Sequence, residues 1–352
     1  MHSTAPAPAR QSLGSLPDCP VELVSPVRAA LRSLPKNTTR IAAAVSGGGD
    51  SAMLALAAAH AARGLGLDLV LFHVHHGLQA QADEWAAHVQ ALGILLAVPV
   101  LQARVRVPDD TGKGVEAAAR EARYEALAGL ARQAGVAQVL LAHHQDDQAE
   151  TVLLRLLRGA GLQGMAAMAA ETERDGVRYL RPWLSVPRAA IRAAAAGFAQ
   201  AQGWQPVEDP TNIDARYTRA AVRTQLKPAL DARWPAWQAI VARHARHMAE
   251  AAEVLAEVAR ADLETLDFSP ADASFSLAAW RDLSPARQLH VLRHWLADQG
   301  LPMPSDARLA ELARQLRQLH ALGHDRQLRW EHAGRVVGCA RGRVVISLSP
   351  RV

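Results

Sequence analysis

Cysteine is nearly absent from this sequence, with only Cys19 and Cys339 among 352 residues. Two cysteines cannot build a disulfide framework, a cysteine-rich zinc site or a four-thiolate iron–sulfur cluster. The scarcity excludes the proteins that depend on such sites, and it fits the reducing environment of the cytoplasm.

Long apolar runs are also absent. No segment approaches the roughly 20 consecutive apolar residues that cross a bilayer. Residues 1–20 are rich in proline, alanine and serine and have no continuous apolar core, so they do not resemble a secretory signal. We expect a disordered tail there, a cytoplasmic protein and no membrane partner.

The chain does carry a moderate excess of positive charge. Its 39 Lys and Arg against 34 Asp and Glu give a formal charge of +5, and the sequence pI is about 9.7. A length of 352 residues is enough for two or three domains. A nucleic-acid partner is compatible with this charge, although charge alone does not identify one.

Strand-like and helical segments alternate over residues 21–232. Strands are expected at 40–45, 67–75, 98–107, 138–143 and 177–183, and helices at 21–34, from 52, at 83–92, 115–134, 146–158 and from Pro187. This alternation predicts an α/β fold with a doubly wound parallel sheet, in which ligands lie at the carboxyl ends of the strands.

Residues 233–352 have a different pattern. A long helix is expected from Trp234-Pro235 to about Leu266, then helices near 285–299 and 305–322, and three short strands within 327–347. We therefore expect a helical connector and a smaller C-terminal α+β domain.

The segment Ser46-Gly47-Gly48-Gly49-Asp50-Ser51 lies between a buried strand and a helix. Glycines allow the backbone to approach an anion, and the first N–H groups of a helix point at it. The two serines add hydroxyl donors. A carboxylate at Asp50 is compatible with a phosphate only if a metal ion or a cation shares the site. This is not a Walker loop, because no lysine lies near Gly49.

A second polar cluster, His143 to Thr151, begins where the fourth strand ends. It holds His143, His144, Asp146, Asp147 and Glu150 within nine residues. Helix capping by Asp146 or Asp147 explains one of these residues but not the two histidines. The histidines also lack the i,i+4 spacing of a zinc-binding helix.

Cations gather in three further places. Arg120 and Arg123 lie on adjacent turns of one helix, Arg155 and Arg158 end the next, and Arg219, Arg223 and Lys227 recur every four residues. Each group is explained either by a solvated helix face or by contact with phosphates.

The Ser-Gly-Gly-x-Asp-Ser pattern resembles the pyrophosphate loop (PP-loop) of the N-type ATP pyrophosphatases. The ordered set of blocks resembles the tRNA(Ile)-lysidine synthetase family. It consists of Ser46–Ser51, His73–Leu78, Arg120–Tyr124, His143–Thr151, Arg158–Leu162, Arg181–Leu184 and Glu208–Asn212. One departure is Ala220, where the family usually has Asn. The C-terminal part resembles the family's middle substrate domain, and we expect the additional terminal domain of some members to be missing.

The resemblance implies a two-step ligase reaction. ATP adenylates the C2 carbonyl oxygen of the wobble cytidine in the isoleucine tRNA with a CAU anticodon and releases pyrophosphate. The side-chain amine of free L-lysine then displaces AMP, and the codon read changes from AUG to AUA. Mg²⁺ is implied with ATP, and a homodimer is one alternative for the assembly.

The resemblance and this chemistry together assign roles to the clusters. ATP is expected at Ser46, Gly47, Gly48, Gly49, Asp50 and Ser51, with Arg120 and Arg123, and Mg²⁺ at Asp50 and Asp147. Catalysis is expected at Asp50, Asp146, Asp147, Glu150 and His143; for the handling of lysine the carboxylates are the candidates, with His143 or His144 as alternatives to them. The tRNA is expected at Arg155, Arg158, Arg219, Arg223 and Lys227. A carboxylate must hold the lysine ammonium and a base must take its proton.

Two rival functions stay open. A tRNA 2-thiolase shares the PP-loop but relies on cysteines for sulfur delivery or a cluster, and neither cysteine here lies near the motifs. A non-enzymatic tRNA-binding protein could keep the fold, although the intact polar blocks argue against it.

Overall fold

The computed structural model describes residues 15–75, 82–105, 115–207, 218–319 and 328–349. They form two compact units, residues 1–248 and 249–352. The sequence placed the boundary at 232/233, but the structure places it inside the long helix α10 (Trp237–Thr265). The reason is that the start of α10 packs on the first unit, where Ala245 is buried against Val152 and Met165.

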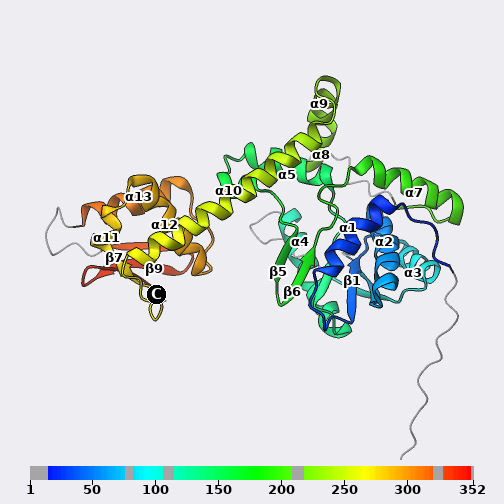
Figure 1. The fold of residues 1–352 in the computed structure, drawn as a ribbon, viewed down its shortest axis with the longest axis horizontal. Helices are drawn as coiled ribbons and strands as arrows, with labels where there is room; N and C mark the ends of the chain where they lie inside the picture. The colour runs from blue at the N-terminus through cyan, green and yellow to red at the C-terminus, as the bar shows by residue number, and fades with distance from the viewer. Residues whose placement is uncertain (1–14, 76–81, 106–114, 208–217, 320–327, 350–352) are drawn as a thin grey trace, which may run out of the picture. The chain divides into compact units, whose positions relative to one another are not determined.

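The first unit contains a six-stranded sheet in the order β3-β2-β1-β4-β6-β5 (Figure 1). Its strands are β1 (Arg40–Ala44), β2 (Asp68–His75), β3 (Val100–Arg104), β4 (Gln138–Leu140), β5 (Glu171–Arg174) and β6 (Val177–Leu180). The pairs are parallel except β5 with β6, and Ala42 pairs with Val70 on one side and Val139 on the other. The predicted doubly wound parallel sheet is confirmed.

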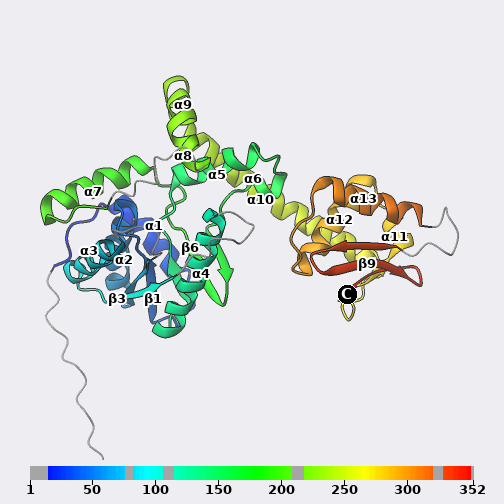
Figure 2. The same cartoon turned by 180° about the vertical axis from the view of Figure 1, so that it is seen from behind.

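Helices cover both faces of this sheet (Figure 2). They are α1 (Val21–Arg32), α2 (Gly49–Leu65), α3 (Ala82–Leu96), α4 (Val115–Ala134), α5 (Gln145–Leu156), α6 (Leu162–Met165) and α7 (Arg188–Gln202). Side chains alternate along a strand, so Ile41 and Ala43 pack with α1, α2, α3 and α7, whereas Ala42 packs with α4. The C-terminal strand ends lie between these layers.

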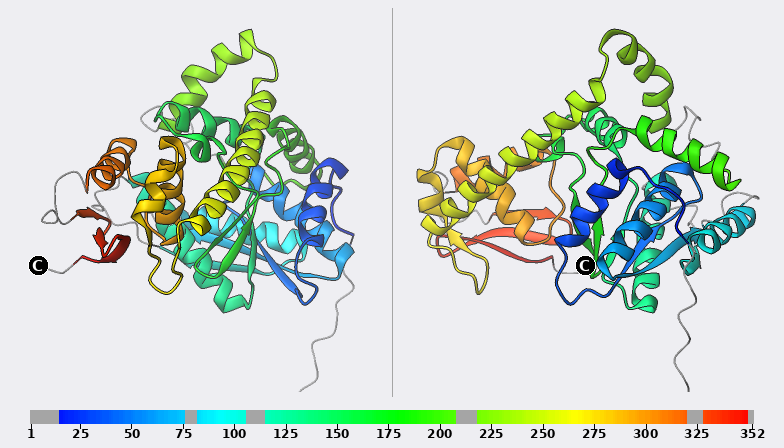
Figure 3. Two further views of the ribbon diagram at one scale, coloured as in Figure 1. Left: turned by 60° about the vertical axis from the view of Figure 1, so that its left-hand side comes forward. Right: turned by 45° about the vertical axis from the view of Figure 1, so that its right-hand side comes forward.

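A helical run follows α7 and ends the first unit. It consists of α8 (Thr218–Ala221), the π-helical turn η2 (Val222–Leu226), α9 (Lys227–Arg233) and the first part of α10. In both views of Figure 3, α9 extends away from the sheet and its covering helices.

The second unit is a small α+β domain, as expected. Its antiparallel sheet has the order β7 (Phe275–Ser276), β10 (Arg343–Leu348), β9 (Arg335–Ala340) and β8 (Arg329–His332). The helices α11 (Leu277–Asp282), α12 (Pro285–Asp298) and α13 (Asp306–Gln318) complete it. Its core is built around Trp280, Trp295 and Phe275, which are fully buried.

A disordered tail was expected over residues 1–20, and the structure differs from this expectation for the last six of them. Residues 1–14 lie outside the described residues. Residues 15–20 are not disordered, because Leu16 and Cys19 pack against the core and the carbonyl of Pro17 lies 2.8 Å from Nε2 of His60. Within the described ranges, no helix is both long and apolar enough to cross a membrane.

Candidate active site

The Ser46–Ser51 loop connects β1 to α2 as the sequence predicted. Gly47 has φ +98°, a conformation that side chains rarely adopt, and α2 begins at Gly49. The Ser51 hydroxyl donates to the Gly48 carbonyl at 2.9 Å and accepts the Ser46 N–H at 3.1 Å. The first N–H groups of α2 have no intrahelical acceptor, so the loop presents an anion site.

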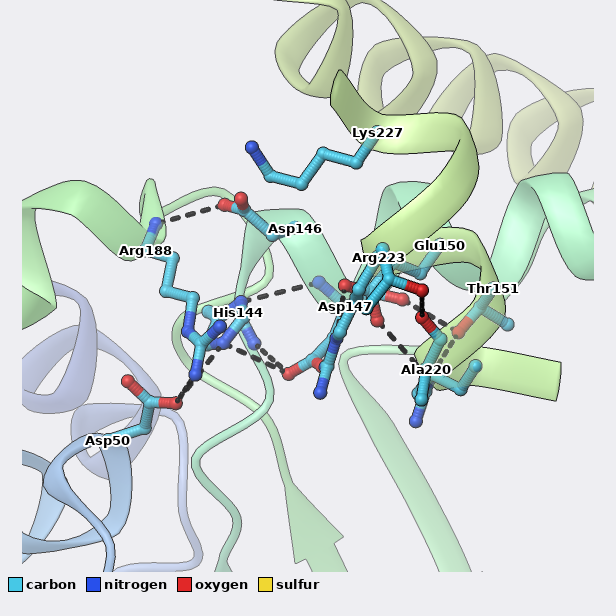
Figure 4. Close-up of polar contacts among 12 residues, drawn as sticks. Asp50, His144, Asp146, Asp147, Glu150, Thr151, Arg188, Ala220, Arg223 and Lys227 are labelled. Atoms are coloured by element: carbon cyan, nitrogen blue, oxygen red, sulfur yellow. Dashed lines mark hydrogen bonds and ion pairs between the residues drawn. The ribbon is translucent and has the colours of Figure 1, made fainter. Parts of the chain in front are cut away.

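Asp50 contacts a guanidinium and an imidazole at this loop. Its Oδ2 lies 3.4 Å from Nη2 of Arg188 and 3.5 Å from Nε2 of His144 (Figure 4). Burial alone would raise the pKa of Asp50, but hydrogen bonds and charges from His144 and Arg188 outweigh it and lower the pKa. The cation that the sequence required beside Asp50 is therefore present in the protein itself.

His144 connects this loop to the second cluster. It is the N-cap of α5, where its Nδ1 accepts the N–H of Asp147 at 3.3 Å and its own N–H donates to Asp147 Oδ2 at 3.2 Å. The proton of the neutral ring therefore belongs on Nε2, which faces Asp50 and Asp147. Burial lowers the pKa of His144, but Asp50 and Asp147 together raise it overall.

The acidic cluster is paired with two arginines. Arg223 contacts Asp147 Oδ1 at 3.1 Å and Glu150 Oε1 at 2.7 Å, and Arg219 Nε lies 3.2 Å from Glu150 Oε2. Asp147 and Glu150 are both buried. The pKa of Asp147 is lowered, because the charges of His144 and Arg219 outweigh the effect of burial.

The expected basic face of three cations is corrected by these contacts. Arg219 and Arg223 point at carboxylates, and Lys227 pairs with Asp231 instead. The π-helical turn η2 lies between Arg219 and Lys227 and changes the regular α-helical spacing on which the prediction depended. Ala220, the departure from the family pattern, is buried in α8.

Asp146 and His143 have different positions from Asp147. Asp146 Oδ1 accepts the backbone N–H of Arg188 at 3.0 Å at the start of α7, so it holds two elements together. His143 Nδ1 is buried with no hydrogen-bond partner among the described residues. Burial lowers the pKa of His143 to about 3, which makes it a weak proton acceptor.

The remaining predicted cations lie apart from the loop contacts. The guanidinium carbons of Arg120, Arg123 and Arg174 lie 5.1–5.8 Å from the Tyr124 ring centre, and Arg181 donates to its hydroxyl at 3.3 Å. These cations form one positively charged group around a single tyrosine.

Of the pair Arg155 and Arg158, Arg158 follows the end of α5 and is exposed. Arg155 instead donates to the carbonyls of Gly164 and Ala167, at 2.7 and 2.8 Å. We therefore keep Arg158 as the stronger candidate for a phosphate contact.

Metal binding was expected at Asp50 and Asp147. Within the part of the chain that the structure describes, no three His, Cys, Asp or Glu side chains are grouped to hold an ion by themselves. Mg²⁺ usually takes one or two carboxylates and completes its shell with phosphates and water. Asp50, beside the anion site, fits such an ion. Asp147 is the weaker metal candidate, because the contacts given above join its carboxylate to His144 and Arg223 and not to the loop.

Each of the two units of the chain matches a known family of domains. Residues 23–230 match the PP-loop domain family, and residues 275–345 match the TilS substrate binding domain. A tRNA(Ile)-lysidine synthase of Bordetella bronchiseptica is 69% identical over 344 residues, which cover 98% of each chain. The chain belongs to the tRNA(Ile)-lysidine synthase family. The resemblance found in the sequence is thereby confirmed.

Two more distant matches to this lysidine synthase family member are one sequence and one solved structure. A tRNA(Ile)-lysidine synthase of Ralstonia nicotianae is 49% identical over 278 residues, 78% of this chain and 58% of that protein. A solved structure, the U34-tRNA thiolase NcsA from Methanococcus maripaludis with its [4Fe-4S] cluster, has a TM-score of 0.54 at 15% identity. It covers 65% of this chain and 79% of its own, and shows the fold alone.

Sequence reasoning missed part of the site of this lysidine synthase family member. Arg188 was not selected, although it follows Pro187 where a helix was expected to begin after the fifth strand. His144 was named only as an alternative to the carboxylates, yet it joins the two clusters. The family blocks at 76–78 and 208–212 lie outside the described residues.

Proposed function

We propose that this chain uses ATP to attach L-lysine to C2 of the wobble cytidine of the isoleucine tRNA with a CAU anticodon, releasing AMP and pyrophosphate. The observation that carries the proposal is one continuous polar network. It runs from Asp50 in the phosphate loop through His144 to Asp147 and Glu150. A phosphate site and an acidic site for an ammonium group are thus adjacent, in a chain of the matching family.

In the first step the loop holds the pyrophosphate that leaves. The α2 N-terminus and the Ser46 hydroxyl would donate hydrogen bonds to phosphate oxygens, while Arg188 and His144 contact the Asp50 carboxylate. Asp50 is the residue that would hold Mg²⁺ together with the phosphates, and the ion would supply positive charge to the leaving group. We assign Arg120 and Arg123 to the polyanionic substrates rather than to the loop.

In the second step the acidic cluster holds the lysine side chain. A lysine amine has a reference pKa of about 10.4 and arrives protonated. Asp147, whose pKa is lowered, stays ionised and binds the ammonium instead of taking its proton. His143 is too weak a base, and Asp146 is engaged with α7. Glu150 shares Arg223 with Asp147 and completes the acidic pair that we assign to the ammonium group.

The rival thiolase chemistry is disfavoured by the state of the cysteines. Burial raises the pKa of Cys19 to about 12, so its thiol stays protonated and is a poor sulfur carrier. Cys339 lies in strand β9 of the second unit, and burial raises its pKa as well.

The proposal is tested by the substrate dependence of ATP cleavage. Release of AMP and pyrophosphate should require the tRNA and be completed only with lysine, and norleucine, which lacks the side-chain amine, should not replace lysine. AMP release that ignores lysine, or that requires a sulfur donor, would contradict the proposal.

We place the reaction in the cytoplasm, where the tRNA substrate is found and both free thiols stay reduced. A homodimer stays a prediction, which sedimentation of the purified chain checks.

A further inference from the structure

The helix α9 contributes no fully buried side chain to the first unit. None of its seven residues, Lys227–Arg233, all of which the structure describes, is buried. It projects from the first unit in Figures 1 to 3 and returns through residues 234–236 into α10. Short helices are marginal in water unless an apolar face is covered, so an exposed helix of this kind needs another explanation.

The projecting helix is nevertheless firmly built. Asp231 accepts hydrogen bonds from Nε1 of Trp237 at 2.8 Å and Nε2 of Gln238 at 3.2 Å, and it pairs with Lys227. The Trp234 N–H donates to the Leu230 carbonyl at 2.8 Å, and the Trp237 N–H donates to the Trp234 carbonyl at 3.1 Å. Backbone hydrogen bonds and the Asp231 side chain hold the turn, and none of these contacts uses the Trp234 side chain.

The end of the projection presents an aromatic ring among cations. Trp234 is 56% exposed, and the guanidinium carbon of Arg233 lies 5.9 Å from its ring centre. The exposed side chains on the first part of α10 include Ile240, Arg243, His244 and His247. We call Arg233 and Trp234 the arm tip.

Charge indicates which class of partner this surface fits. Residues 227–248 contain one carboxylate, Asp231, and its charge is already paired with Lys227. Their remaining charged side chains are all cationic. An exposed tryptophan beside arginine is the combination that stacks on nucleic-acid bases while cations contact the phosphates. A surface for a protein partner would not require this excess of cations.

The arm tip is also connected to the active site. One helical run carries Arg223, which contacts Asp147 and Glu150, and then Trp234. At 1.5 Å of helix rise per residue, eleven residues separate the two along the axis by about 16 Å. A single strand of RNA with one base in the acidic cluster reaches the arm tip within a few nucleotides.

We propose that the arm tip binds the anticodon loop of the substrate tRNA, with Trp234 stacked on an unpaired base near the modified cytidine. The inference rests on the proposed function for the identity of the RNA. It adds the element of the first unit that holds the loop while the wobble base occupies the active site.

The test uses the full chain and an anticodon stem–loop RNA, intact or with single abasic sites in the loop. Trp234→Ala should bind the intact RNA about tenfold more weakly, the scale of one base–aromatic stack. Trp234→Phe should stay close to wild type. Removing the base at one loop position should weaken RNA binding by the wild-type chain by a similar factor. The same abasic RNA should bind Trp234→Ala no more weakly than the intact RNA does. The KM for ATP should be unchanged in every variant.

Arg233→Ala should reduce the slope of log affinity against log salt concentration by about one, because one phosphate contact is lost. The matched control is Arg32→Ala, which removes an equally exposed arginine from α1 and should leave that slope unchanged. Thermal melting of each variant reports whether the fold is retained.

Two results would overturn the inference. In the first, Trp234→Ala binds every RNA as wild type does. In the second, RNA affinity is unchanged and the variant alters self-association in sedimentation, which makes the arm tip a contact between copies. Failure of the proposed function has a different signature: the RNA binds through Trp234, but no lysine is attached.

Discussion

At the scale of single residues, Asp147 has the properties of an anchor for an ammonium group. It is buried, its pKa is lowered, and its oxygens face Arg223 and His144. Asp147→Asn removes the charge at nearly constant shape. Because a hydrogen bond to a charged group contributes about 1.5–3 kcal/mol, the KM for lysine should rise by roughly 10- to 100-fold.

The matched control for this change is Asp146→Asn. An asparagine at 146 still accepts the Arg188 N–H, so the KM for lysine should change little. Steady-state kinetics at limiting lysine compare the two variants. A wild-type rate for Asp147→Asn under those conditions would show that the carboxylate does not hold lysine.

His143 predicts a dependence of stability on pH. Its pKa is about 3 in the folded chain and about 6.5 when unfolded, because burial and the charges of Arg123, Arg181 and Arg219 outweigh the attraction of Asp147. A histidine with a lowered pKa contributes stability above pH 6.5, and this contribution is lost as the pH falls toward 3. Between pH 6.5 and 5 the loss amounts to at most about 2 kcal/mol.

Urea unfolding of His143→Gln and wild type at pH 7 and pH 5 measures this effect. The variant should lose less stability than wild type on acidification, since the other acidic groups act equally on both proteins. Equal losses would mean that the imidazole is not held neutral in the folded chain.

At the scale of elements, the phosphate loop depends on Gly47. An alanine there is forced into φ +98°, which costs on the order of 1–3 kcal/mol and displaces the N–H groups at the start of α2. Gly47→Ala should therefore raise the KM for ATP and lower stability. Gly64→Ala, in the exposed last turn of the same helix with open space around it, should leave the KM for ATP unchanged and stabilise by at most about 0.5–1 kcal/mol.

Kinetics and urea unfolding separate the two glycines. Equal effects on the KM for ATP from Gly47→Ala and Gly64→Ala would contradict the assignment of the loop as the phosphate site.

The α8–η2–α9 run makes a similar contrast between two cations. Arg223→Ala leaves Asp147 and Glu150 short of a partner and should cost about 3 kcal/mol, as breaking a buried ion pair does. Lys227→Ala removes an exposed pair and should cost at most about 1 kcal/mol. Denaturant midpoints for both variants test this ordering. The reverse ordering would favour the sequence prediction, in which Arg219, Arg223 and Lys227 share one helix face.

Sequence reasoning succeeded where local pattern and tertiary environment agree. The alternation of strands and helices, the glycine loop and the cluster after the fourth strand all lie where they were expected, because parallel neighbours β1 and β4 bring their C-terminal ends together. Strand β5 was missed because all four of its residues are exposed and it has no apolar period.

The ion pairs could not be derived from spacing alone. The four-residue repeat of Arg219, Arg223 and Lys227 assumes a regular α-helix, and the π-helical turn changes which way each cation points. The role of Arg188 depends on the sheet order that places α7 beside the loop, and a one-dimensional pattern does not contain that order.

At the scale of the whole molecule, fold and function are separate questions. The fold is shared with a tRNA thiolase at 15% identity, so the sheet alone does not choose between lysine transfer and sulfur transfer. What distinguishes them here is the site: buried carboxylates paired with arginines next to the phosphate loop, and cysteines held as protonated thiols.

The measurement that tests this account most directly is mass analysis of the wobble nucleoside. The purified chain is incubated with ATP, isotope-labelled L-lysine and the isoleucine tRNA with a CAU anticodon, and the tRNA is then digested to nucleosides. The account predicts that the wobble cytidine gains the mass of labelled lysine less one water. An unchanged cytidine, or one in which sulfur has replaced oxygen, would contradict it.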